Sequence, residues 1–295
     1  MNSDKKACYV ALTVDVDPDA NSPVGGRPDA ISRGQSGRVK TRASREGLRI
    51  IRNICHELSI PVCLFWEART LRLFNKLTPA LLEDVLSEND WEHALHGFRH
   101  EDFAGEVSGQ PLGSDETFRI LHKATDIVTS LTKRNISAFR APYCRLTEPV
   151  KNALIKLGFA YDASLTQTLG TDSKLKPLCL ATRDSAPLFE LPLCRGTDQS
   201  GHPISCYLWQ LFEGNRQPDD YMYLVEETLR LCPGGLLQIA LHPWHLKVNS
   251  KGEPTGKEDS PFATIFQQLL EGIKGLSTVR FTTPGKFLHR WHQTM

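Results

Sequence analysis

The segment HALHGFRHEDF, residues 93–103, has three histidines within eight positions. The whole chain has ten histidines in 295 residues, so a random distribution would rarely produce this cluster. His96 and His100 are four positions apart, and on one helical turn both imidazoles could bind a single metal ion. The glutamate of H-E-x-x-H proteases is absent because Gly97 follows His96, so a general base must come from elsewhere. His93 is out of phase with the other two histidines and is expected in the core or behind the ligands, and not as a ligand itself.

Two aspartates end the first strongly apolar segment of the chain, ACYVALTVDV at 7–16 and its continuation. Asp15 and Asp17 are two positions apart, so in a continued strand they share one face. Two adjacent carboxylates repel each other, and a nearby cation removes that repulsion. Two histidines and one carboxylate form a site with open positions that suits Zn²⁺, and also Fe²⁺ or Co²⁺. The alternative is a pair of turn or helix-capping aspartates before Pro18.

Apolar runs of strand length alternate with longer amphipathic runs along the chain. Strands are expected at 7–16, 61–66, 91–97, 136–143, 159–165, 188–193, 236–243 and 277–284. Helices are expected at 44–59 with Ser44 as its cap, 77–87, 114–134, 147–157, 219–231 and 261–274. Long loops are expected at 18–43, 166–200 and 247–260. This alternation is typical of a parallel sheet covered by helices and closed, or nearly closed, into a barrel.

Polar side chains of catalytic types recur where the expected strands end. They are Asp15 and Asp17, His96 and His100, Arg140 and Tyr143, Asp162, and His242 with Trp244. In an α/β barrel the carboxyl ends of the parallel strands share one face, and that face holds the active site. Five separate strand ends therefore bring these side chains to one place.

The overall composition excludes several classes of function. Lys and Arg total 35 against 34 Asp and Glu, so no net field would attract nucleic acid or an anionic membrane. No stretch is long enough to span a bilayer, and the first residues are too polar for a signal peptide. The eight cysteines follow no CxxC pattern and are expected to be buried, reduced thiols in a cytoplasmic protein.

These motifs together resemble the polysaccharide deacetylase family, the NodB homology domain of carbohydrate esterase family 4. The resemblance rests on Asp15-x-Asp17, His96-x-x-x-His100, Arg140-x-Pro142-Tyr143, Tyr161-Asp162 and Leu241-His242, in that order. It covers about residues 7 to 290 and implies one domain over 1–295. The implied fold is a distorted (β/α) barrel of about seven strands, of the NodB/glycoside hydrolase–deacetylase type. Members hydrolyse N-acetyl, and sometimes other acyl, amides with a divalent metal. By this resemblance Asp17, His96 and His100 would hold that metal.

The same resemblance implies roles for four further residues. Asp15 would be the general base, and Arg140 would hold that base in place. The backbone N–H of Tyr143 would help to stabilise the oxyanion, and His242 would be the general acid for the leaving amine. The chemistry is consistent, because a Zn²⁺-type ion activates water near neutral pH and a histidine can carry a proton there. Zn²⁺ is the expected ion, with Fe, Co or Ni as alternatives.

The sequence departs from the common family pattern at several positions. Val16 separates the two aspartates, and Cys144 stands where a glycine usually follows the tyrosine. The YDASL segment lacks the Asp-Trp pair of the chitin and peptidoglycan enzymes, which argues against a polymer substrate. Asp162 would either be the partner of His242 or tie down a loop. Trp244 would either stack on a sugar or close the end of a strand.

The basic residues that follow the first expected strand bear on the nature of the substrate. Eight basic residues lie between Arg27 and Arg52, opposed only by Asp29 and Glu46. They are either a solvated face or a grip for phosphate on a nucleotide-linked or lipid-linked amino sugar. The "DVD…REG" opening resembles, more loosely, the deformylase of aminoarabinose lipid modification.

Three functions are therefore open. The first is a metal-dependent hydrolase of an N-acetylated or N-formylated amino sugar or sugar conjugate, and the second is a hydrolase of a small non-sugar amide such as a cyclic ureide. The third is a catalytically silent binding protein on the same fold. Loss of a motif position would favour the third, but Asp15, both metal histidines, Arg140 and His242 are all present. Motifs do not separate the first two, because they share chemistry and scaffold.

Overall fold

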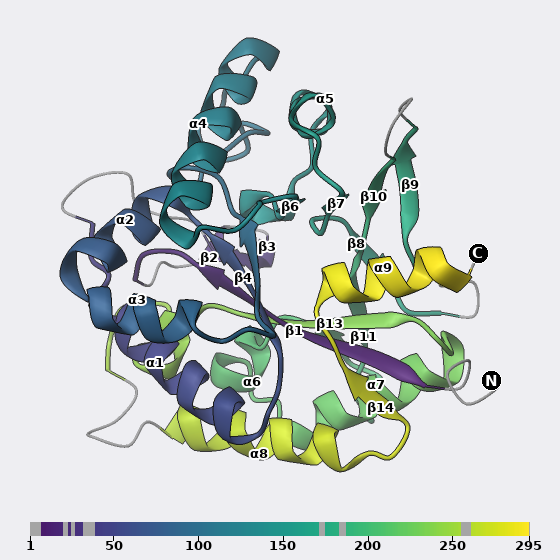
Figure 1. The fold of residues 1–295 in the computed structure, drawn as a ribbon. Helices are drawn as coiled ribbons and strands as arrows, with labels where there is room; N and C mark the ends of the chain where they lie inside the picture. The colour runs from purple at the N-terminus through teal and green to yellow at the C-terminus, as the bar shows by residue number, and fades with distance from the viewer. Residues whose placement is uncertain are drawn as a thin grey trace.

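The computed structural model describes residues 7–19, 23–24, 27–31, 39–170, 175–182, 187–254 and 261–294 (Figure 1). Within them the main sheet has nine strands: β1 (Cys8–Val16), β4 (Val62–Trp66), β5 (Glu92–Leu95), β6 (Ala138–Phe139), β7 (Tyr161–Asp162), β9 (Leu178–Ala181), β10 (Leu188–Glu190), β13 (Leu236–Leu241) and β14 (Val279–Phe281). Their order is β13-β1-β4-β5-β6-β7-β10-β9, with β14 also beside β1. Every pair is parallel except β9 with β10.

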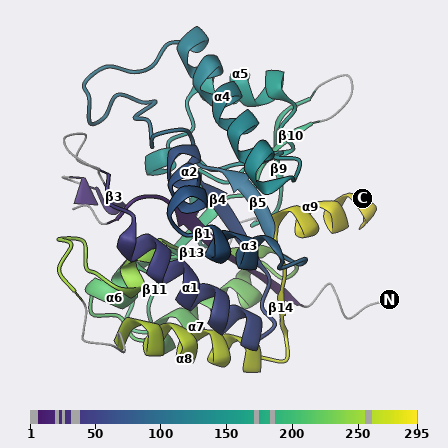
Figure 2. The same ribbon diagram turned by 60° about the vertical axis from the view of Figure 1, so that its left-hand side comes forward.

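This sheet curls into an incomplete barrel whose outer face is covered by helices, while the C-terminal helix packs against the inner face. The helices are α1 (Arg42–Glu57), α2 (Ala68–Leu77), α3 (Pro79–Leu86), α4 (Ser114–Thr132), α5 (Glu148–Leu157), α6 (Trp209–Glu213), α7 (Pro218–Leu231), α8 (Pro261–Gly275) and α9 (Pro284–Thr294). In both ribbon views α1, α7 and α8 lie on one side of the strands and α4 and α5 on the other (Figures 1 and 2). The α/β fold and the distorted barrel expected from the sequence are therefore confirmed.

Alternation along β1 explains how one strand serves both the core and a polar site. Val10, Leu12 and Val14 face the helices in the larger core cluster. Tyr9 and Ala11 face the inside of the barrel, where they pack with small and aromatic residues from the neighbouring strands and with Phe287 of α9. Because strand side chains alternate, the inner face continues through Thr13 to Asp15. The inside of the barrel is thus apolar at the amino ends of the strands and polar at their carboxyl ends.

Several segments differ from the sequence-based expectation. The helix at 68–77 and the C-terminal helix α9 were not expected, although Leu71 and Phe74 of α2 are fully buried. The segment 166–200, expected as a loop, contains strands, among them β8 (Thr166–Thr168) and β11 (Leu193–Thr197). With β12 (Pro203–Ser205) these strands form a second sheet of order β12-β11-β8.

The cap expected for the first long helix is supplied differently. The helix α1 begins at Arg42, before Ser44. The carboxylate of Asp19 accepts hydrogen bonds from the N–H groups of Ala43 and Ser44 at 3.1 and 2.7 Å. An aspartate from the preceding loop therefore satisfies donors at the start of the helix.

The loop expected at 18–43 is described in part. It contains the short strands β2 (Pro23–Val24) and β3 (Arg27–Ile31), which pair antiparallel, and residues 20–22, 25–26 and 32–38 lie outside the described residues. The second half of the expected loop at 247–260 also falls partly outside them. All eight cysteines are described and each is a free thiol, but the expectation that all are buried is wrong for Cys144, which is half-buried, and for Cys179, which is exposed. Among the described helices none is long and apolar enough to span a bilayer.

Candidate metal centre and active site

Asp17 follows β1 directly and lies at the carboxyl end of the sheet. The hydroxyl of Ser44, in the first turn of α1, donates a 2.6 Å hydrogen bond to the Asp17 carbonyl oxygen. This contact fixes the backbone at the point where the chain leaves the strand. The side chain of Asp17 is 4% exposed, so its carboxylate is held in a largely dehydrated environment.

The two histidines of the HALHGFRHEDF segment are brought together by a bend, and the helical turn considered from their spacing is not present. His96 follows β5, Gly97 has a φ of +77° and His100 a φ of +58°. The left-handed conformation at these positions reverses the chain within four residues. The ring centroids of His96 and His100 are then 5.2 Å apart. His93 instead faces the helices, where its Nδ1 accepts a 3.0 Å hydrogen bond from the Trp66 indole.

Asp17, His96 and His100 form a buried group that could hold a metal ion. One ligand atom from each residue lies within 4.8 Å of the other two, and His100 Nε2 is 3.7 Å from Asp17 Oδ2. His96 Nδ1 lies 2.8 Å from the carbonyl oxygen of Arg140, which can only accept. Nδ1 therefore carries the proton, and Nε2 keeps its lone pair for a ligand bond, as in many metal sites. The donor set of two imidazoles and one carboxylate fits a Zn²⁺-type ion.

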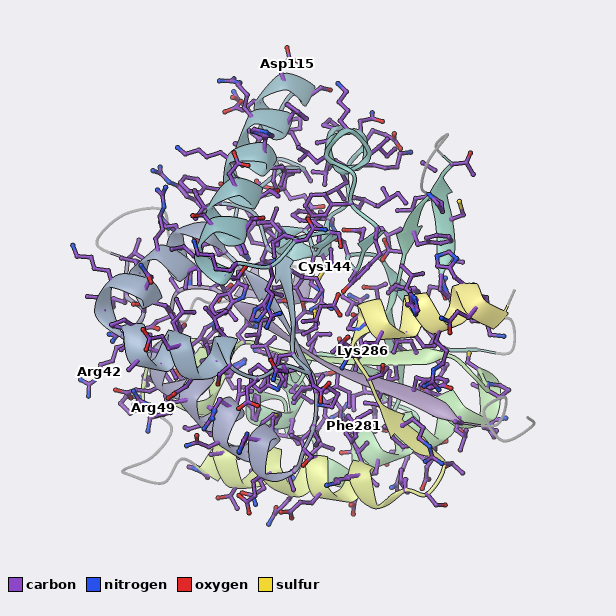
Figure 3. All side chains as sticks on the ribbon, in the orientation of Figure 1. Arg42, Arg49, Asp115, Cys144, Phe281 and Lys286 are labelled. Carbon is purple, nitrogen blue, oxygen red and sulfur yellow. The ribbon has the colours of Figure 1, made fainter. Side chains whose placement is uncertain are left out.

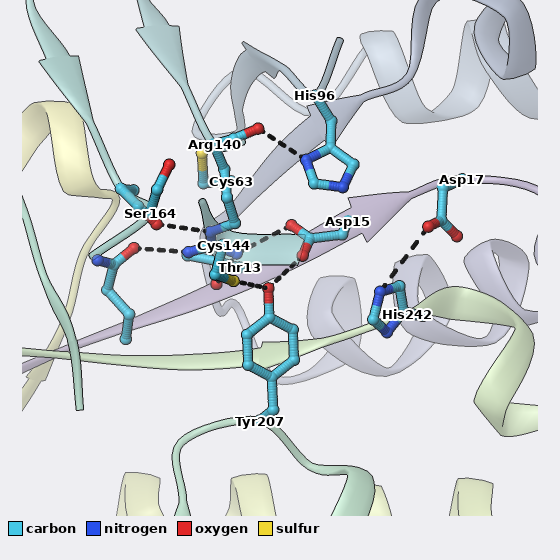
Figure 4. A network of polar contacts seen from close by, with 12 residues as sticks. Thr13, Asp15, Asp17, Cys63, His96, Arg140, Cys144, Ser164, Tyr207 and His242 are labelled. Atoms are coloured by element: carbon cyan, nitrogen blue, oxygen red, sulfur yellow. Dashed lines mark hydrogen bonds and ion pairs between the residues drawn. The ribbon is translucent and has the colours of Figure 1, made fainter. Parts of the chain in front are cut away.

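Asp15 lies next to this group and is held by charged and polar neighbours (Figure 4). Arg140 donates to Asp15 Oδ1 at 2.9 Å, and the hydroxyl of Tyr207 donates to Asp15 Oδ2. Arg140 is fully buried, and its other N–H groups reach Thr13, Gln238 and the Ala163 carbonyl. Its guanidinium also lies over the ring of Phe65, at 4.3 Å. These further contacts fix the arginine, and through it the carboxylate, in one orientation.

The ionisation of Asp15 follows from these contacts. Burial raises the pKa of this carboxyl, but Arg140, His96, His242 and the Tyr207 hydrogen bond together hold its pKa below the usual value. Asp15 is therefore ionised at neutral pH and can accept a proton. The same burial, with the Asp15 charge beside it, raises the pKa of Tyr207 well above its usual value, so this hydroxyl remains a donor.

Tyr207 is the residue of this site that the sequence interpretation missed. It follows β12, and its ring stacks on His242 at 5.8 Å between centroids. A parallel bridge to Ala240 and a hydrogen bond from the Tyr221 hydroxyl to its carbonyl oxygen, at 2.8 Å, hold its backbone. No local pattern distinguishes it, because the stretch ISCYLWQ has neither a strand nor a helix period.

The turn after β6 contains the other residue expected near the reacting carbonyl. Tyr143 and Cys144 have φ values of +58° and +54°, a conformation that L-residues rarely adopt. The glycine that the family usually has at the second position would adopt this conformation without strain. The ring of Tyr143 packs edge-on against His100, 4.6 Å between centroids. This turn therefore lies directly against one of the candidate metal ligands.

His242 follows β13, and its Nε2 is 3.8 Å from Asp17 Oδ2. Trp244 stacks on it at 5.5 Å and is only 1% exposed, so it packs behind the histidine and presents no open face to a ligand. His245 lies 4.0 Å from Trp244, and its Nε2 contacts Glu213 Oε1 at 2.6 Å. The position of His242 is thus set by aromatic rings on two sides.

The carboxylate of Asp162 accepts hydrogen bonds from the backbone N–H and from the hydroxyl of Ser164, at 3.1 and 2.8 Å. The Ser164 hydroxyl in turn accepts a hydrogen bond from the N–H of Ala141 at 2.7 Å. Glu190 lies beside Asp162, and burial and that neighbouring carboxyl raise the pKa of Glu190 well above its usual value. Burial raises the pKa of Asp162 as well, so the pair retains a proton between two buried carboxyls.

Comparison with solved structures extends over nearly the whole chain. A protein from Mycobacterium smegmatis described as a polysaccharide deacetylase matches with a TM-score of 0.67 at 19% identity, over 98% of this chain and 92% of that one. The allantoinase Puue matches with a TM-score of 0.66 at 17% identity, again over 98% and 92%. A protein from Pseudomonas aeruginosa PAO1 described as a probable polysaccharide deacetylase gives 0.63 at 16%, with the same coverage. The chain therefore has the polysaccharide deacetylase fold. Comparisons of the sequence with protein-family models and with curated proteins give no match.

Proposed function

We propose that this protein is a metal-dependent hydrolase that removes an N-acyl group, acetyl or formyl, from an amino sugar or sugar conjugate. The observation that carries the proposal is the adjacency of a buried Asp17–His96–His100 donor set and an oriented carboxylate, Asp15. A donor set without a base would suit a structural ion, and a base without the donor set would suit an ion pair. Both together suit hydrolysis.

Each step of amide hydrolysis has a candidate residue on this face. A divalent ion held by the donor set, most simply Zn²⁺ with Fe, Co or Ni as alternatives, would supply Lewis-acid activation of the carbonyl and of water. Asp15 then accepts a proton from the attacking water, with Arg140 and Tyr207 fixing the direction of its lone pairs. The Tyr143 N–H donates to the developing oxyanion. His242 gives a proton to the departing nitrogen, so that the products are a carboxylic acid and an amine.

The alternative within the same chemistry is hydrolysis of a small non-sugar amide, such as a cyclic ureide. It is favoured by one specific observation, because the allantoinase matches as well as the deacetylase-type proteins do, with TM-scores of 0.66 and 0.67. The fold therefore carries no preference between the two substrate classes. An inactive binding protein is the third possibility, and the presence of both the donor set and Asp15 argues against it.

The test is a panel of substrates assayed with metal control. The full-length protein is freed of metal with a chelator, reloaded with Zn²⁺, Co²⁺, Ni²⁺ or Fe²⁺, and incubated with N-acetyl and N-formyl amino sugars, their phosphate conjugates and cyclic ureides. We expect released acetate or formate, lost on chelation and restored by metal. Turnover of ureides alone would establish the alternative, and a metal-loaded protein that turns over none of these compounds would contradict the proposal.

A further inference from the structure

A cavity of about 450 Å³ lies beside the proposed reaction centre, and no role has been assigned to it so far. Its wall includes Cys144, whose Sγ is 3.5 Å from the hydroxyl of Tyr207, the donor to Asp15. Pro192 is also in the wall, and its carbonyl oxygen lies 3.3 Å from Nε2 of Gln238. The Oε1 atom of the same glutamine accepts a hydrogen bond from Arg140. Two chains of contacts therefore connect the cavity with Asp15, one through Cys144 and Tyr207 and the other through Gln238 and Arg140.

The lining of this cavity is cationic. Two of the lining residues are arginines, Arg145 and Arg195, and none is acidic. Arg145 follows the strained turn at Tyr143 and Cys144, and its Nε contacts Glu106 at 2.7 Å while 42% of the side chain stays exposed. Arg195 is exposed on β11, where the register with Thr168 of β8 fixes its backbone. Two guanidinium groups from two separate segments in the lining of one cavity favour an anionic ligand.

The remaining polar groups of the lining suit a ligand that also has hydrogen-bond donors. Gln167, on β8 between two threonines of the lining, has a buried Oε1 atom without a hydrogen-bond donor among the described residues. A buried amide oxygen of this kind is costly unless a ligand or water satisfies it. The volume lies within the usual range of small-ligand pockets, roughly 300–1,000 Å³.

The basic residues of α1 do not share this location. Figure 3 shows Arg42 and Arg49 at the outer edge of the molecule, well apart from Cys144 near its centre. Arg42 is paired with Glu46 at 2.8 Å and Arg52 with Glu88 at 2.9 Å. These three arginines of α1 therefore lie away from the cavity, while Arg33 and Arg38 of the same basic stretch lie outside the described residues.

We infer that the cavity is a substrate subsite that binds an anionic substituent, a phosphate or a carboxylate, through Arg145 and Arg195. This inference rests on the proposed function and narrows it, because the scissile amide would lie at Asp15 while the anionic group lies between the two arginines. The substrate is then a small N-acylated amine that carries a negative charge, and a neutral polymer would gain no charge-assisted contact from these two arginines.

Binding measurements test this without relying on turnover. The metal-loaded full chain is titrated calorimetrically with N-acetylglucosamine 6-phosphate, N-acetylmuramate and neutral N-acetylglucosamine, at low and high salt. Arg145→Gln and Arg195→Gln are compared with two matched controls. Arg230→Gln removes an exposed arginine paired with Glu227, as Arg145 is paired with Glu106, and Arg280→Gln removes an exposed strand arginine like Arg195.

We expect the wild type to bind one of the charged sugars more tightly than the neutral one, and which of the two it prefers separates phosphate from carboxylate. Each subsite variant should weaken that binding by roughly 10- to 100-fold, the effect of one charge-assisted hydrogen bond, and should lower its salt dependence. The neutral sugar and both control variants should be unaffected. Equal affinity for charged and neutral sugars, or equal affinity in the wild type and both subsite variants, would overturn the inference. These outcomes do not depend on hydrolysis: an anion subsite in a protein without turnover would refute only the proposed function, and turnover without anion preference would refute only the subsite.

Discussion

The hydroxyl of Tyr207 donates a hydrogen bond to Asp15 Oδ2, across 192 positions of the chain. The other oxygen of this carboxylate, Oδ1, accepts a hydrogen bond from the Arg140 guanidinium at 2.9 Å. The Tyr207 ring also stacks on His242, so one side chain contacts both the proposed base and the proposed acid. The geometry of the proton-transfer groups therefore depends on a residue far from all the recognisable motifs.

Replacement of Tyr207 by phenylalanine tests this dependence. Tyr207→Phe keeps the ring that stacks on His242 and removes only the hydroxyl. We expect kcat to fall roughly 10- to 100-fold, the effect of one hydrogen bond to a charged group, with KM and metal content nearly unchanged. Tyr161→Phe is the matched control, because it removes another buried hydroxyl bonded to a carboxylate, Glu92, at 2.7 Å and at the amino end of the sheet. Equal kinetic losses in both variants would mean that the effect is structural.

The buried pair of Asp162 and Glu190 predicts an unusual dependence of stability on pH. The folded protein keeps a proton on Glu190 above the pKa that this residue has in the unfolded chain, because burial and Asp162 raise its folded pKa. This contribution to stability is full below about pH 4.5 and is lost as the pH rises toward the folded pKa. Glu190→Gln is a neutral substitute whose oxygen can still accept from the N–H of Leu165, as Glu190 does at 2.9 Å.

We therefore expect the free energy of unfolding of Glu190→Gln, relative to that of the wild type, to increase as the pH rises from 5 to 8. Urea denaturation at several pH values measures the difference, which should change by up to about 1.4 kcal/mol per pH unit for one proton. A difference that stays constant over this range would show that Glu190 is ionised in the folded protein.

His93 predicts a pH dependence on the acid side. Burial, with the charge of Arg134, lowers the pKa of His93 to about 4, so the imidazole is neutral in the fold. A depressed pKa gives stability that is present above about pH 6.5 and lost as the pH falls toward 4, on the order of 3 kcal/mol for this group. His93→Gln can still accept a hydrogen bond from the Trp66 indole. This variant should therefore lose less unfolding free energy than the wild type as the pH falls from about 6.5 toward 4. His122→Gln, at a side chain 56% exposed, should leave the acid loss in place, and an unchanged acid profile in His93→Gln would contradict the assignment.

The sequence predicted the parts of the site that lie on strong local patterns. Asp15 and Asp17 follow a nine-residue strand that is buried along its whole length, and such strands read as continuous apolar runs. Arg140 and His242 likewise follow runs that form strands. The phase of His93 was also readable, because strand alternation places it on the opposite face from His96.

Other parts of the structure leave no such trace. The second sheet consists of strands of three to five residues with exposed positions, too short and too polar for a period of two to be recognised. Tyr207 reaches Asp15 only through the packing of that sheet against β13. The helical turn considered from the spacing of His96 and His100 is replaced by a bend, in which left-handed residues at Gly97 and His100 bring the two rings to 5.2 Å.

The central claim is that Asp17 binds the metal and Asp15 moves the proton, and the pair of asparagine variants tests it most directly. Metal content, by elemental analysis of purified protein, and kcat are measured for Asp15→Asn and Asp17→Asn side by side. We predict that Asp15→Asn retains about one metal equivalent and near-normal substrate binding but loses roughly 10²-fold or more in kcat. Asp17→Asn should lose metal, with activity partly restored by excess ion. Metal loss in Asp15→Asn with full metal in Asp17→Asn would reverse the two roles, and full metal in both would contradict the account.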